Sequence, residues 1–331
     1  MRWQILAVGA LAMIGVRYVQ AEDLAAELKK TGYRIVYETL RDGNWELCMV
    51  GMDGSPPVNL TRTPHVNEMY PKVSPDGTKI AFVVDTGEGE TRTRDVYYMN
   101  FDGTGRKLVA RGARWPVWSA DGRAIAYLKQ GGERFAFNDG YTTGLFVYDL
   151  ASGTHKAHVN PHIGHIYNPC WSLDGKWFVA TVSGGMGYRH TNLAIEAEGM
   201  QVVDLKIGGC RPDISPDGKK VAWGSSDWTM SVGDLDFTGP QPKVVNKRDV
   251  VVSTKPFQIY HMDWSPDGKY VAFSRGMAKK GLGTHPAIIG VPAEGWNICV
   301  ADASQRDHWV AITSDGKSNK EPDWVPPPRS R

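Results

Sequence analysis

Six residues with diverse side chains occupy the same position in a repeated stretch of this sequence. Each lies directly before one copy of the repeat, and the six are Tyr70, Trp115, Asn168, Arg211, His261 and Glu321. A rigid scaffold gives no reason for one position to vary in this way between copies. Aromatic, amide and charged side chains that converge are typical of pockets for sugars or small polar ligands. We therefore predict that these six residues form a binding site.

Histidine is the other residue type here that could bind a metal or take part in a reaction. Three converging imidazoles can hold a divalent metal, and the candidates are His162, His165 and His261. The pair His162-x-x-His165 is a weak motif in a loop, so solvated histidines without a shared ligand are the alternative. No cofactor is expected.

The repeat itself predicts the elements that would position these residues. Each copy has a short apolar segment, an Asp-Gly turn and a triplet such as Ile-Ala-Phe, as in Pro71–Phe82. Asp-Gly tolerates the positive φ of a tight hairpin, so a copy encodes two antiparallel strands. A third strand, a second turn and a fourth strand follow, and the whole unit recurs about every 40–50 residues, which is typical of a β-propeller blade.

Five complete copies and one divided copy predict an all-β, six-bladed β-propeller. The divided copy joins Glu321–Trp324 near one end of the sequence to Arg34–Tyr37 near the other. Strands from both ends would therefore close the ring and remove exposed sheet edges. We expect a signal peptide over 1–21, a short helical or linker segment over 22–33 and the propeller over 34–331.

Loop length distinguishes the two faces of this propeller. The short Asp-Gly turns belong to one face, and the longer loops within and between blades belong to the other, at 85–94, 129–143, 183–191 and 274–295. Binding residues concentrate on long loops held by a rigid scaffold. We call this the long-loop face, and we expect it to carry the six variable residues at the mouth of the central channel. Its further polar residues include Asp139, Tyr167, His190, Asp227, Tyr260, Arg275, Lys279 and His285.

Composition restricts the class of protein. A positively charged start, an apolar run over 3–16 and Val19-Gln20-Ala21 are typical of a cleaved signal peptide, which places the mature chain in the periplasm or outside the cell. The formal net charge of +2 argues against a nucleic-acid partner. No later stretch is long and apolar enough to cross a membrane. Cys48 and Cys299 are expected to be free thiols, whereas Cys170 and Cys210 could be close enough to pair.

The phrase Trp-Ser-Pro-Asp-Gly-x-x-Ile-Ala-Phe resembles the PD40 repeat of TolB-like propellers, a WD40-like repeat family. The resemblance covers essentially the whole mature chain and implies a TolB-like propeller. TolB proper carries an α/β domain ahead of its propeller, whereas only 23–31 precede the first strand here, so we expect a relative of TolB and not TolB itself. The sequence has no Gly-x-Ser-x-Gly motif, which argues against a serine peptidase.

The resemblance and the residues leave three functions open. One is a purely structural component or a component of cell-envelope assembly. Of the other two, the first is an exported module that binds a protein, peptide or glycan through the long-loop face. The second is a propeller-fold lyase for uronate-containing glycans, which needs a base and cations to neutralise the carboxylate. His261 or His165 would then be the base, Arg211 and Arg275 would hold the carboxylate, and Tyr260 or Tyr167 would protonate the leaving oxygen.

Overall fold

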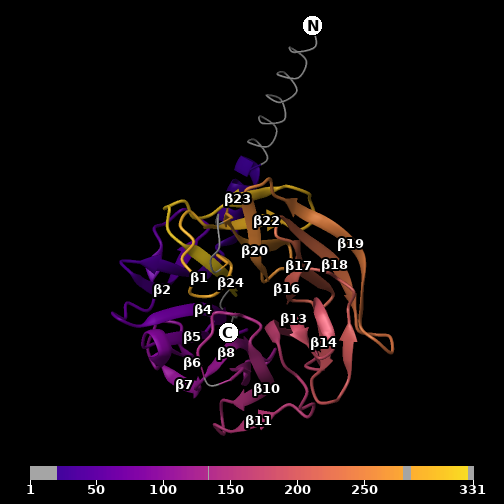
Figure 1. Cartoon of the computed structure of the whole chain (residues 1–331). Helices are drawn as coiled ribbons and strands as arrows, with labels where there is room; N and C mark the ends of the chain where they lie inside the picture. Colours follow the sequence, from indigo (N-terminus) through magenta and orange to yellow (C-terminus); the bar gives the residue numbers. More distant parts are fainter. Residues whose placement is uncertain (1–20, 133, 279–284, 327–331) are drawn as a thin grey trace.

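The described part of the chain contains six four-stranded antiparallel sheets. The computed structural model describes residues 21–132, 134–278 and 285–326, so the expected signal peptide lies outside the described residues except for Ala21. The sheets surround a central axis as the blades of a propeller (Figure 1). The predicted six-bladed β-propeller is confirmed.

Blades are numbered in chain order from the first complete repeat. Blade one contains β4 (Asn67–Val73), β5 (Lys79–Thr86), β6 (Thr93–Asn100) and β7 (Lys107–Ala110). Blade two contains β8 (Ala113–Trp118), β9 (Ala124–Gln130), β10 (Thr142–Asp149) and β11 (His155–Ala157). Blade three contains β12 (Ile166–Trp171), β13 (Trp177–Gly185), β14 (Tyr188–Glu196) and β15 (Val202–Asp204).

The remaining three blades follow the same order, the last one shared between the two ends of the chain. Blade four contains β16 (Cys210–Ile214), β17 (Lys220–Ser226), β18 (Thr229–Asp236) and β19 (Lys243–Val252). Blade five contains β20 (Phe257–Trp264), β21 (Tyr270–Met277), β22 (Asn297–Asp302) and β23 (Trp309–Ala311). Blade six contains β24 (Asn319–Val325), β1 (Arg34–Arg41), β2 (Asn44–Gly51) and β3 (Val58–Asn59).

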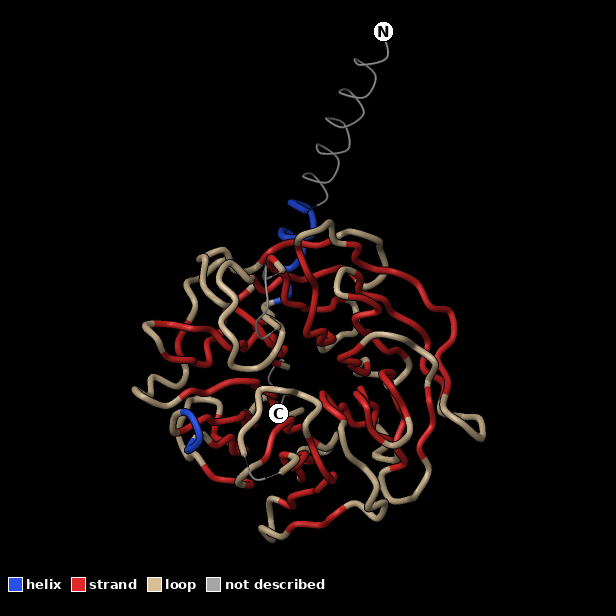
Figure 2. Tube along the Cα trace, in the orientation of Figure 1, coloured by secondary structure: helices blue, strands red, loops and turns tan. Residues whose placement is uncertain are grey.

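Both ends of the chain close the ring as predicted. β24 is the innermost strand of blade six and pairs with β1, with Trp324 opposite Ile35. Ahead of β1, a helix over 21–31 (blue in Figure 2) buries Leu24 and Leu28 in an apolar cluster that includes Tyr270 of blade five. Within the described residues, no helix is long and apolar enough to span a membrane.

The Ser-x-Asp-Gly phrase recurs because its serine and aspartate side chains and its glycine backbone all stabilise the turn. In blade one the Ser74 hydroxyl donates to Asp76 at 2.6 Å and accepts from the Lys79 amide at 2.9 Å. Asp76 also accepts from the Thr78 amide at 3.0 Å, and Gly77 adopts φ 71°. The positive φ explains why glycine recurs at this place. The repeat therefore encodes a hairpin.

Two of the predicted long loops are shorter in the structure than the sequence suggested. Residues 183–191 mostly belong to β13 and β14, which continue to Gly185 and resume at Tyr188. Residues 85–94 are strand at both ends around a short 3₁₀ turn, Gly89–Thr91. In both segments the polar and glycine-rich residues lengthen the hairpin strands and do not form a separate loop. The four cysteines are all free, as expected for Cys48 and Cys299, and Cys170 and Cys210 do not pair.

Candidate functional site

The six variable residues form a ring at equivalent places on the innermost strands. Each has a positive φ, between 49° and 60°, although none is a glycine. Each also coincides with a register shift, as between Met69 and Lys72 in blade one or Tyr260 and Asp263 in blade five. An L-residue in this left-handed conformation costs roughly 1–2 kcal/mol. All six innermost strands therefore contain a bulge at the same level, in spite of this conformational free-energy cost.

The ring is buried, in contrast to the open channel mouth that the sequence suggested. Exposed fractions of its six side chains run from 0% for Trp115 to 8% for Asn168. Tyr70 and Trp115 meet edge to face at 4.7 Å, and the Arg211 guanidinium lies 5.4 Å from the Trp115 ring. The ring is therefore a packed plug of aromatic and charged groups.

One segment of the blade-five insertion covers the plug, and we call residues 285–293 the strap. Its backbone carbonyls accept hydrogen bonds from buried cations of three blades. Lys320 donates to Pro286, Ile288 and Val291 at 3.1, 2.8 and 3.0 Å. Arg211 donates to Ala287 at 2.7 Å, and Arg94 donates to Ile289 at 3.3 Å. These contacts fix the strap across the long-loop end of the channel.

Under the strap, ion pairs already engage side chains that the sequence predicted to bind a ligand or substrate. Arg211 pairs with Asp139 at 2.6 Å and with Glu321 at 3.4 Å. Burial alone would lower the pKa of Arg211, but these carboxylates raise it. Burial raises the pKa of Glu321 to about 8, although Arg211 and Lys320 act in the opposite direction. Arg211 is thus a fixed charge with its partners already in place.

His261 is held just as firmly. Its Nε2 lies 2.9 Å from the Ala287 carbonyl oxygen and 3.0 Å from Glu321 Oε1. Burial, followed by the neighbouring Arg211 charge, lowers the pKa of His261 well below its usual value. A neutral ring that donates from Nε2 to a carbonyl leaves only Nδ1 as a base. Nδ1 is buried and has no hydrogen-bond partner among the described residues, so no ligand in solution can reach it.

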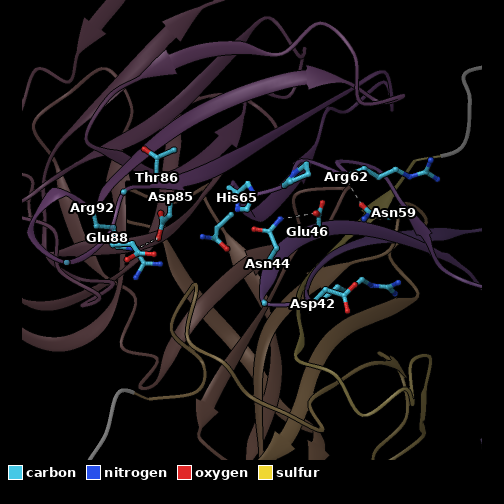
Figure 3. Close-up of a pocket in the computed structure, with 16 residues that line it drawn as sticks. Asp42, Asn44, Glu46, Asn59, Arg62, His65, Asp85, Thr86, Glu88 and Arg92 are labelled. Atoms are coloured by element: carbon cyan, nitrogen blue, oxygen red, sulfur yellow. Dashed lines mark hydrogen bonds and ion pairs between the residues drawn. The ribbon is translucent and has the colours of Figure 1, made fainter.

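Between blades six and one, the long-loop face contains a groove of about 1020 Å³ (Figure 3). Arg92 and Glu88 lie at one end of this groove and Arg62 lies at the other, with Asn44 and His65 between them. Its charged lining combines both signs: Arg41, Arg62 and Arg92 with Asp42, Glu46, Asp85 and Glu88. We call it the charged groove. The sequence placed the loop 85–94, which contains Arg92, on this face but did not indicate the residues of the β1–β2 turn.

Hydrogen bonds hold the walls of the charged groove in place. Asn44 donates to Glu46 at 2.9 Å, and Glu46 accepts from the Thr61 hydroxyl at 2.5 Å. Arg92 lies 3.3 Å from Asp85 and over the Phe137 ring at 4.8 Å. By contrast, Arg62, His65 and Glu88 are exposed. A rigid wall with exposed charges of both signs can bind an extended polar segment.

A second hollow, of about 330 Å³, is lined by residues of blades two, three, four and five. We call it the Tyr–His pocket, and its lining includes Asp139, Tyr167, His190, Arg211, Asp227, Tyr260 and His285. The Tyr260 hydroxyl donates to Asp227 at 2.5 Å and lies 3.4 Å from His285. Tyr167 lies 3.2 Å from His190. The structure thus gathers long-loop residues that the sequence could only assign to one face.

At neutral pH the tyrosine and histidine side chains of the Tyr–His pocket are uncharged. Burial lowers the pKa values of His190 and His285. Burial, together with the hydrogen bond to Asp227, raises the pKa of Tyr260. Arg211 reaches the pocket wall, but its donors serve Asp139, Glu321 and the strap. The pocket therefore has hydroxyls and imidazoles for a ligand but no cation left for a carboxylate.

The other predicted site residues do not join this constellation. Arg275 stacks on Phe257 at 4.4 Å and on Trp309 at 4.8 Å and donates to Ser253 at 3.1 Å, apart from Arg211. His162 and His165 are exposed, whereas His261 is buried. Lys279 lies outside the described residues. Across 21–132, 134–278 and 285–326 there is no group of three or more His, Cys, Asp or Glu side chains placed to hold a metal.

Neither a family model nor a curated protein sequence matches this chain. Among solved structures, TolB from Acinetobacter baumannii aligns with a TM-score of 0.60 and 19% identity, covering 89% of this chain and 67% of that chain. An oligogalacturonate lyase in complex with manganese aligns with a TM-score of 0.50 and 11% identity, covering 84% and 73%. An oligogalacturonate lyase from Vibrio parahaemolyticus aligns with a TM-score of 0.50 and 11% identity, covering 86% and 75%.

At such low identity these likenesses concern the fold. The manganese of the lyase complex has no counterpart ligand set among the described residues of this chain. The fold of this chain is that of a TolB-like six-bladed β-propeller.

Proposed function

We propose that this protein is an exported, periplasmic or secreted, binding module that holds an extended peptide segment of a partner in the charged groove. One observation carries the proposal. The ring of variable residues is closed by the strap, and the long-loop face keeps a preformed groove of about 1020 Å³ with exposed charges of both signs. Peptide segments carry donors, acceptors and charges of both signs along their length, which suits such a lining.

The charges at the two ends of the groove suggest how a segment would lie. Arg62 is exposed at one end, where a ligand carboxylate would meet it, and Glu88 is exposed at the other, where a ligand cation would meet it. Interface charges of this kind set orientation and association rate more than total affinity. The partner segment would therefore bind in one direction.

A random-peptide display library selected on the immobilised protein tests this proposal. Selected peptides should carry charges of both signs, and Arg62→Glu should weaken their binding about tenfold or more. Arg123→Glu is the matched control, because it makes the same charge change on an exposed residue of an Asp-Gly turn on the other face. Peptides that bind both variants equally would contradict the proposed site.

The lyase reading keeps one supporting feature, the Tyr–His pocket, which holds Tyr260 and Tyr167 beside imidazoles. Neither predicted base lines this pocket, because His261 is buried under the strap and His165 is exposed outside the pocket lining. The predicted carboxylate clamp is not assembled either, because Arg211 is buried and engaged and Arg275 stacks on Phe257. Incubation with polygalacturonate, followed by ultraviolet absorbance of the unsaturated product, tests it. We expect no product; product that disappears in Tyr260→Phe would support the lyase and contradict our proposal.

A further inference from the structure

The opposite end of the channel contains a cavity that neither the repeat nor the long-loop face explains. It has a volume of about 350 Å³ and lies among the Asp-Gly turns, with Pro75, Pro216 and Pro266 in its wall. We call it the short-turn cavity. Four indole rings line it, those of Trp118, Trp171, Trp264 and Trp324.

Indole N–H groups around this cavity are already used. Trp118, Trp264 and Trp324 donate to the backbone carbonyls of Lys72, Asp213 and Asp263 in the neighbouring blade at 2.8, 3.2 and 3.0 Å. Trp171 instead donates to Gly175 of its own turn at 3.1 Å. Three indoles thus tie blades together, as their repetition suggests, and what they offer to the cavity is ring surface.

Carboxylates outnumber cations at the bottom of the cavity. Lys72 bridges Asp323 at 2.7 Å and Asp263 at 3.3 Å. Asp213, at the equivalent position in blade four, has no ion-pair partner within 4.0 Å among the described residues. Its Oδ2 accepts from the Trp264 amide at 2.9 Å, which fixes the carboxylate in place.

Beside Asp213 lies a second, independent acceptor. Asn168 also lines the cavity, is only 8% exposed and donates its Nδ2 to the Pro212 carbonyl at 3.2 Å. Its Oδ1 has no hydrogen-bond donor within the part of the chain that the structure describes. An amide oxygen in a cavity wall that has no protein donor is free to accept a hydrogen bond from a ligand or a water.

We propose that the short-turn cavity binds an organic cation, an ammonium or guanidinium group on an apolar stem, between Asp213, Asn168 and the indole rings. Asp213 would supply the counter-charge and Asn168 Oδ1 a further acceptor. Aromatic faces attract cations, and tryptophan does so best. Four indoles and several prolines would cover the stem. This site lies on the face opposite the charged groove, so it does not depend on the proposed function.

The charge balance predicts how pH affects this binding. Burial, reinforced by Asp263, raises the pKa of Asp213 to about 7. The titratable groups that interact with it are Asp263, Lys72 and the Cys170 thiol, and Asp323 lines the same cavity. A cation binds best when Asp213 is ionised, so its affinity should rise between pH 6 and pH 8.

Tryptophan fluorescence titration with n-butylguanidinium measures this binding, with n-butanol as the neutral control. Asp213→Asn should lower the affinity about tenfold while its side-chain oxygen still accepts from the Trp264 amide. Asp102→Asn is the matched control, since it removes a carboxylate from another turn of the same face outside the cavity lining. A Gly-Arg-Gly peptide blocked at both ends forms a second arm: tighter binding than n-butylguanidinium indicates an arginine side chain as the natural source, and weaker binding indicates a free cation.

Trp171→Ala gives an independent variant, because this indole makes no hydrogen bond between blades. We expect it to fold and to weaken the guanidinium several-fold, with partial recovery in Trp171→Phe. Equal binding of butanol and butylguanidinium, or unchanged affinity in both Asp213→Asn and Trp171→Ala, would overturn the proposal.

Discussion

Arg211 shows most clearly how a residue can look functional in the sequence and be structural in the fold. It is 3% exposed and joins Asp139, Glu321 and the strap carbonyl of Ala287. It differs from the equivalent residues of the other blades because it completes a buried charge network, and not because it binds a ligand. Variation at equivalent positions of a repeat can therefore have two causes: ligand recognition, or packing that is particular to one blade.

Removing Arg211 should destabilise the propeller strongly. Arg211→Met leaves buried carboxylates without their cation, which costs about 3–5 kcal/mol of the free energy of unfolding. Urea unfolding checks this. Arg123→Met, at an exposed turn, should leave the stability unchanged. A loss for Arg211→Met below about 1 kcal/mol would contradict the buried network.

Glu321 should make the stability depend on pH. Its pKa is raised to about 8 in the folded state, from a usual value near 4.5. The folded state then binds the proton more tightly than the unfolded state, so the contribution of Glu321 is full below about pH 4.5 and is lost as pH rises towards 8. Glu321→Gln should lose less stability than the natural protein between pH 6 and pH 8.5 in urea unfolding. Identical losses would refute the assignment.

Among the elements, the strap is the one that the sequence could not predict. Its contacts are backbone carbonyls that accept from Lys320, Arg211 and Arg94, all distant in sequence. Every residue has a backbone carbonyl, so the side chains of residues 285–293 do not indicate that their carbonyls accept these hydrogen bonds. The left-handed bulge of the ring could not be predicted either, because Tyr, Trp and Glu do not favour positive φ. The hairpins were predictable, because Ser-x-Asp-Gly makes all its bonds locally.

Loosening the strap should not unfold the blades. The double variant Glu38→Gln with Lys320→Met removes three hydrogen bonds to the strap without leaving the buried Glu38 charge unpaired. At about 0.5–1.5 kcal/mol for each bond, amide exchange over 285–293 should accelerate at least tenfold. The single variant Glu38→Gln is the control. Unchanged exchange in the strap would show that other contacts hold it.

The whole molecule depends on closure by its two ends, which the divided repeat correctly predicted. β24 supplies the inner strand of blade six, and the Trp324 amide donates to Asp263 of blade five at 2.9 Å. Which hollows remain open on the closed ring was not predictable, because the charged groove needs the β1–β2 turn and the β5–β6 connection side by side.

Cutting the chain before β24 should therefore prevent folding. A chain that ends at Ser318 leaves β1 without its inner neighbour and blade five without a partner. A chain that ends at Pro326 keeps β24 and should unfold like the full protein. Thermal unfolding followed by circular dichroism compares the two. A cooperative transition of the shorter chain at the full-length temperature would contradict closure by β24.

The central claim is that a preformed groove on the long-loop face binds a partner's peptide segment. Affinities of one selected peptide for the natural protein, Arg62→Glu and Arg123→Glu, measured by isothermal titration calorimetry, test it most directly. We predict a loss of about tenfold or more for Arg62→Glu, equivalent to about 1.4 kcal/mol or more of binding free energy, and no loss for Arg123→Glu. Equal affinity for all three proteins, or a loss confined to Arg123→Glu, would contradict the claim.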